Sequence, residues 1–101
     1  MSQMVLFSLI VSPLVEDAVI DLFLEHEAVS GFTSYPINGH GTSPQGLTPA
    51  EKVSGRQRQL LFQIHLEEAQ VDSLLESLNS TFSGSGFHYW ILPVLSIGRI
   101  Q

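Results

Sequence analysis

The chain has 101 residues, a formal net charge of −6 and no cysteine; 44% of its residues are hydrophobic and 14% are charged. This length allows one domain over residues 1–101, and the lack of cysteine excludes disulfides and thiolate metal sites. The negative charge argues against a nucleic-acid partner, since phosphate binding needs clustered lysines and arginines. Because nothing indicates an oxidising compartment, we expect a cytoplasmic protein.

The first half of the chain predicts a strand, a helix and a second strand. Residues Val5–Val11 are apolar on both alternating faces apart from Ser8, which predicts a central strand, and the run is too short to insert into a membrane. A helix should follow Ser12 and Pro13 and end near residues 27–28, because a cap and a first-turn proline precede apolar residues at helical spacing. The second strand is expected at residues 32–37.

Residues 39–55 form a long polar stretch rich in Gly, Pro, Ser and Thr. Most connections in a small domain are much shorter, so a loop of this length is usually functional. Thr48, Pro49 and Glu51 fit a capping box and predict a single helical turn within it. We expect this loop to be the part that moves or contacts a regulated protein partner.

The second half predicts a strand, a helix and a final strand. Residues 60–66 alternate between apolar and mixed positions, and the helix after them carries an apolar stripe at intervals of three and four. A flexible turn at residues 83–86 precedes the last strand, expected at Tyr89–Ile97. Pro93 places that strand at a sheet edge or a bulge, because proline cannot donate to the ladder.

The order strand, helix, strand, strand, helix, strand is that of a ferredoxin-like α+β fold, with a four-stranded antiparallel sheet and two helices on one face. Two helices can cover only one face of such a sheet, yet the first and last strands are apolar on both faces. The other face therefore needs a cover, and self-association is the simplest one.

The run from Glu51 to Arg58 resembles the segment of PII signalling proteins that closes their long loop and opens the third strand. The Gly84, Ser85, Gly86 turn corresponds to the PII turn between the second helix and the fourth strand, and the Ile97, Gly98, Arg99 ending is similar to a PII-like branch associated with heavy-metal efflux systems. This resemblance implies a trimer whose sheets line the interior, with nucleotide bound in clefts between subunits. Two positions differ from the PII pattern. Phe87 follows the turn where PII has a lysine, and this chain has one C-terminal arginine, Arg99, where PII has two.

Our first hypothesis is a sensor that binds an anionic small molecule, a class that includes the nucleotides implied by the resemblance to PII. Its ligand-binding residues would be Gly55, Arg56, Arg58, Gly84, Gly86 and, from a neighbouring subunit, Arg99. Guanidinium groups fork onto phosphate or carboxylate, and glycines let backbone donors approach closely. The alternative is that the arginines pair with the helix acids and the glycines are ordinary turn residues. The ligand and any cofactor stay unidentified.

The second hypothesis is a metal-binding accessory protein linked to heavy-metal resistance. His40 lies in the loop and His88 follows the glycine-rich turn, and one histidine per subunit of a trimer can build a three-histidine site. The third hypothesis is an enzyme. We expect no catalytic activity, because the sequence contains no P-loop, nucleophile elbow or metalloprotease pair. Tyr89 and Trp90 could stack on a ligand ring, although packing is the alternative role.

Overall fold

The computed structural model describes residues 3–40 and 56–101 of the chain. Four strands form one antiparallel sheet: β1 (Met4–Val11), β2 (Thr33–Gly39), β3 (Gln57–Glu67) and β4 (His88–Pro93). Two helices, α1 (Glu16–Glu25) and α3 (Val71–Phe82), each follow a short 3-10 turn, η1 (Pro13–Val15) and η2 (Glu68–Gln70). The order of elements and the antiparallel sheet are those of the predicted ferredoxin-like fold.

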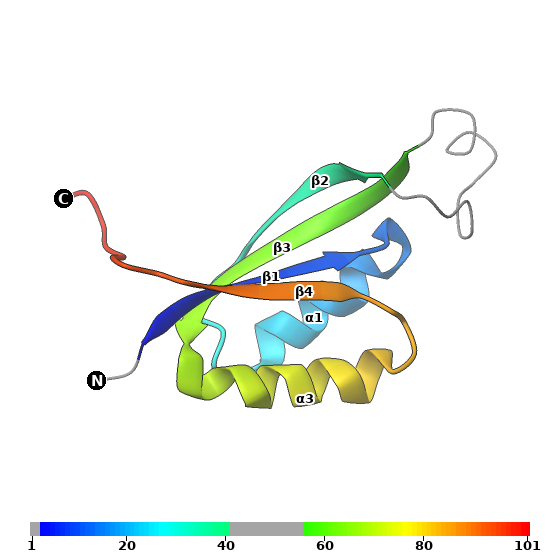
Figure 1. The fold of residues 1–101 in the computed structure, drawn as a ribbon. Helices are drawn as coiled ribbons and strands as arrows, with labels where there is room; N and C mark the ends of the chain where they lie inside the picture. The colour runs from blue at the N-terminus through cyan, green and yellow to red at the C-terminus, as the bar shows by residue number, and fades with distance from the viewer. Residues whose placement is uncertain (1–2, 41–55) are drawn as a thin grey trace.

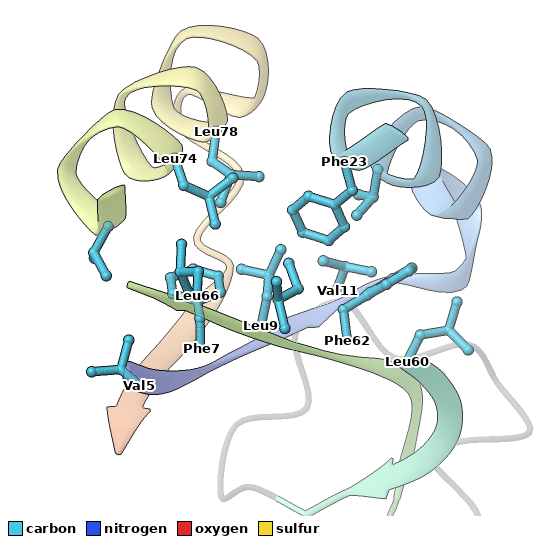
Figure 2. Packing of buried hydrophobic residues seen from close by; sticks show 13 residues of the cluster. Val5, Phe7, Leu9, Val11, Phe23, Leu60, Phe62, Leu66, Leu74 and Leu78 are labelled. Atoms are coloured by element: carbon cyan, nitrogen blue, oxygen red, sulfur yellow. The ribbon is translucent and has the colours of Figure 1, made fainter. Parts of the chain in front are cut away.

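The strand order in the sheet is β2-β3-β1-β4, so the expected central position of β1 and edge position of β4 are confirmed. Both helices lie against one face of the sheet (Figure 1). The core fills the space between the two layers (Figure 2). Alternate residues of the central strands supply it from below, namely Val5, Phe7, Leu9 and Val11 of β1 and Leu60, Phe62, Ile64 and Leu66 of β3.

The helices close the core from the other side. Phe23 of α1 and Leu74 of α3 are completely buried, and the ring of Phe23 meets the ring of Phe62 edge-on at a centroid distance of 5.5 Å. The amphipathic spacing of these helices therefore predicted the correct buried side. Both bury their apolar stripe and leave their acidic residues facing outward.

Two elements end earlier than the sequence predicted. The first helix ends at Glu25 rather than near residues 27–28, because His26 leaves the helical conformation and its Nδ1 accepts a hydrogen bond from the Ala28 amide at 3.1 Å. The last strand was expected to reach Ile97 but ends at Pro93, which pairs with Val5 near the start of β1. Beyond Pro93 only the Val94 amide still donates, to the Met4 carbonyl at 3.0 Å.

The capping box at residues 48–51 lies outside the described residues, as does most of the 39–55 loop. Within residues 3–40 and 56–101, no helix combines the length and apolar character needed to cross a membrane.

Candidate functional site

The strand directions place most of the predicted ligand-binding residues at one end of the sheet. β3 and β4 both run antiparallel to β1, so each begins beside the carboxyl end of β1, where Val11 pairs with Leu60 and Ile10 with His88. Arg56 and Arg58 therefore lie at this end from one side and the Gly84–Gly86 turn from the other (Figure 1). The strands that carry them are separated by two inter-strand spacings, about 10 Å.

The glycine-rich turn has a backbone that only glycine adopts easily. Gly84 and Gly86 have φ angles of 78° and 73°, in the left-handed region. A Cβ atom at either position would meet nothing within 4 Å, so conformation and not space demands glycine here. The Ser85 amide donates to the Phe82 carbonyl at 3.0 Å, and the Phe87 amide donates to Ser85 Oγ at 3.3 Å. The turn is thus exposed and held by two internal hydrogen bonds, and its backbone groups lie close to the surface of the protein.

The two arginines flank the start of β3. Arg58 pairs with Asn38 of β2, and alternation along the strand puts it on the same side as the core residue Leu60. Both arginine side chains are exposed, so their guanidinium groups can reach a ligand at the surface. Gly55, the third predicted residue of this segment, lies outside the described residues.

Arg99 lies away from the other predicted residues within one chain. It follows β4, whose last residue Pro93 pairs near the start of β1, and the chain then extends beyond the sheet (Figure 1). The longest dimension of the molecule is 48 Å. Arg99 could join the glycine-rich turn only from a neighbouring subunit, as the first hypothesis supposed.

The two histidines of the metal hypothesis do not meet in one chain. His40 follows β2 and His88 begins β4, and these strands form opposite edges of the sheet, three spacings or about 14 Å apart. No group of three or more His, Asp or Glu side chains within residues 3–40 and 56–101 could hold a metal ion. The described part of the chain gives the metal hypothesis no support.

The helix-free face of the sheet is apolar, as the sequence predicted. Residue pairs in the register share a face, so the residues facing away from the helices alternate with the core residues on each strand. The apolar members of this face are Met4, Leu6, Ile10, Tyr35, Ile37, Leu61, Trp90 and Leu92. Trp90 and Leu92 remain exposed, and so do Leu95 and Ile100 on the segment after β4. Such a surface on a small domain indicates an interface.

A groove of about 590 Å³ lies between the two helices, away from these residues. Its polar wall includes Glu25, His26, Ser73 and Glu76, and Ser73 Oγ is 3.3 Å from His26 Nε2. This contact ties the end of α1 to the start of α3. Because His26 Nδ1 and Nε2 both have partners within the fold, we assign this pair a structural role.

Comparisons with known proteins give the family and the fold. A family model described as "Protein of unknown function (DUF3240)" matches residues 1–101. The chain is also similar to the crystal structure of a DUF3240 family protein from Shewanella baltica OS155, with 27% identity, a TM-score of 0.82 and complete coverage of both chains. No curated protein matches the sequence.

Two further structures have the same fold at lower identity. Both are of CPII, a nitrogen regulatory PII-like protein from Thiomonas intermedia K12, bound to ADP, AMP and bicarbonate. One is 18% identical with a TM-score of 0.70 and covers 97% of this chain and 96% of that one. The other is 17% identical with a TM-score of 0.67 and covers 90% of this chain and 91% of that one. The predicted PII-like ferredoxin fold is therefore confirmed.

Proposed function

This chain belongs to the DUF3240 family, and from that premise we propose that it is a regulatory protein of the PII-like type that acts by binding, not by catalysis. Its ligand would be an anionic small molecule, with adenine nucleotides as the first candidates. The observation that carries the proposal is that Arg56, Arg58 and the Gly84–Gly86 turn lie at the same end of the sheet. The likeness of fold to CPII, bound to ADP, AMP and bicarbonate, supports it.

The proposed binding site lies in a cleft between subunits of a cytoplasmic homotrimer. A cleft of this kind would bring Arg99 of one subunit to the turn of another, which a single chain does not do. The apolar helix-free face supports self-association, since burying it removes large side chains from water. The loop at residues 39–55 would contact a regulated partner. The association with heavy-metal efflux systems stays a prediction from the sequence resemblance.

Isothermal titration calorimetry with ATP, ADP and AMP tests the ligand. We expect binding by the wild type and a loss of at least about tenfold in affinity for Arg56→Ala, because a charge-assisted hydrogen bond to phosphate is removed. Arg56→Lys is the matched variant: it keeps the charge but loses the planar fork, so its affinity should lie between the two. Absence of heat with every nucleotide at millimolar concentration would contradict the nucleotide version.

Native mass spectrometry of freshly purified protein tests the assembly. A mass of three chains, with or without retained small molecules, is the expected result. A single-chain mass at high protein concentration would remove the shared cleft and with it the role of Arg99.

A further inference from the structure

A cavity of about 180 Å³ lies beneath the glycine-rich turn, between α3 and β4. Six apolar or aromatic side chains from β1, α3, the turn and β4 line it: Leu9, Leu75, Leu78, Phe82, Phe87 and Tyr89. Asn79 and the Gly84–Gly86 turn form a polar part of the wall of similar extent. The wall contains no charged side chain, although Gly84 and Gly86 also belong to the proposed anion site.

Aromatic rings in fixed contact form two sides of the cavity. Phe82 and Phe87 pack with ring centroids 5.5 Å apart at an angle of 47°, and Tyr89 stacks on the buried ring of Phe7 at 5.6 Å and 16°. Leu9 and Leu78 are buried at the base, whereas Tyr89 is 48% exposed. The cavity thus has a closed apolar base and an opening to solvent beside the edge strand.

The lining favours one class of small molecule. Ser85 Oγ already accepts the Phe87 amide, which leaves Asn79 as the principal polar side chain in the wall. A charged ligand would lose water here without a compensating charge. An aromatic ring would instead gain edge-to-face and offset contacts with the phenylalanines and Tyr89.

The volume agrees with this chemistry. An apolar cavity of about 150 Å³ engineered into another protein stays dry and binds benzene. At about 180 Å³, this cavity has room for a single six-membered ring with a small substituent.

We propose that this cavity is a binding site for a neutral, single-ring aromatic compound. The site is formed within one subunit; it shares Gly84 and Gly86 with the proposed anion site but uses neither arginine. In this proposal Phe87, which stands where PII has a lysine, contributes to binding, because its side chain completes the apolar part of the cavity wall.

Nuclear magnetic resonance of the full chain labelled with ¹⁵N tests the site, with phenol as the probe. We expect saturable shifts confined to amides around the cavity, such as those of Leu78, Gly86 and Tyr89, with a dissociation constant of about 1 mM or tighter. Cyclohexanol, similar in size but without a π-system, should bind at least about twofold more weakly. Shifts that do not saturate, or that spread over the whole surface, would overturn the proposal.

A filling variant separates this cavity from other apolar surface. Leu75→Trp should occupy the space and weaken phenol binding at least tenfold, whereas Leu24→Trp, at a position 70% exposed on α1, should leave it unchanged. Leu75→Ala is a second variant in case Leu75→Trp does not fold. It enlarges the cavity, so we expect it to retain phenol binding and also to bind 2-naphthol, which we expect the wild type to exclude. Equal phenol affinity in the wild type and Leu75→Trp would refute the assignment.

The assembled protein offers one more decisive result. If a side chain of a neighbouring subunit occupied the cavity, phenol would not bind the assembly and the proposal would be wrong. Binding of ADP without phenol would overturn only this inference, and binding of phenol without any nucleotide would overturn only the proposed function.

Discussion

Ser8 is completely buried on the face of the sheet that no helix covers. Its Oγ accepts a hydrogen bond from Gln63 Nε2 at 3.4 Å, and Gln63 Oε1 accepts one from the Tyr35 hydroxyl at 3.4 Å. These three residues form a hydrogen-bonded polar row across β1, β3 and β2, beside the apolar side chains of the same face. A row of this kind resists a shift in register, because a one-residue slip would turn its members toward the core.

Gln63→Leu tests the row, since it leaves the buried Ser8 hydroxyl without its donor. We expect a loss of about 1–3 kcal/mol in the free energy of unfolding, measured by urea denaturation. Gln59→Leu is the matched control, because Gln59 lies on the same face of β3 and its side chain has no hydrogen bond within the described residues; the change in the free energy of unfolding should stay within about 0.5 kcal/mol. Equal effects of the two substitutions would show that the row contributes nothing.

Gly86→Ala tests the turn that carries both proposed sites. A Cβ in the left-handed region costs about 1–2 kcal/mol, so the free energy of unfolding should fall by that amount. Gly31→Ala should be neutral or slightly stabilising, because Gly31 has no positive φ and an open surrounding. Thermal unfolding of both variants measures the difference, and a Gly86→Ala protein as stable as Gly31→Ala would contradict the φ argument.

At the scale of elements, the end of α1 depends on one side chain. His26 accepts the Ala28 amide hydrogen bond through Nδ1 and contacts Ser73 of α3 through Nε2, so a single ring both holds the turn after α1 and links that turn to the other helix.

His26→Ala should therefore lower the free energy of unfolding by about 1–2 kcal/mol, since two modest hydrogen bonds are lost. His88→Ala, at an exposed position on β4, should change it by no more than about 0.5 kcal/mol. Chemical denaturation at neutral pH gives both values. A larger effect at His88 than at His26 would reverse this assignment.

Hydrophobic spacing in the sequence predicted both helices and the two central strands, because each of them buries one periodic set of side chains. The outer strands β2 and β4 are largely exposed, and they were predicted from apolar runs and the turn residues that bound them. The sequence did not predict where the last strand ends. Residues 94–97 are as apolar as the strand before them, but β1 has only Met4 left to pair beyond the level of Pro93, so the ladder stops for lack of a partner. Strand length here depends on the neighbouring strand, which local sequence does not report.

The candidate site was predictable in its parts and not in its arrangement. A glycine-rich turn and two arginines are visible as residues, but only the pairing of β3 and β4 with β1 shows that they share one end of the sheet. The roles of Tyr89 and Trp90 were open for the same reason. The register places Tyr89 opposite Leu9 on the helix side and Trp90 opposite Ser8 on the other, so the two adjacent aromatics belong to the proposed binding cavity and to the proposed interface respectively.

At the scale of the whole molecule, the helix-free face should control assembly. Leu92 lies on it opposite Leu6 and is 50% exposed. Leu92→Lys would place a charge in the proposed interface, where burial without a partner is strongly unfavourable. We expect sedimentation velocity to show a shift toward single subunits.

Leu24→Lys provides the control for that experiment. Leu24 is a leucine of similar exposure on the outer surface of α1, and the substitution there should leave the sedimentation coefficient of the assembly unchanged. If both variants assembled like the wild type, the helix-free face would not be the interface.

The two outer strands of the sheet each contain a proline, Pro36 in β2 and Pro93 in β4. Each lacks the N–H that a newly added strand would need, so neither rim offers an unbroken template for growth in the plane of the sheet. Copies of this molecule can still associate through the apolar helix-free face into a closed oligomer. Open-ended growth of the sheet, a risk for a small protein with so much exposed β-structure, is disfavoured at both edge strands.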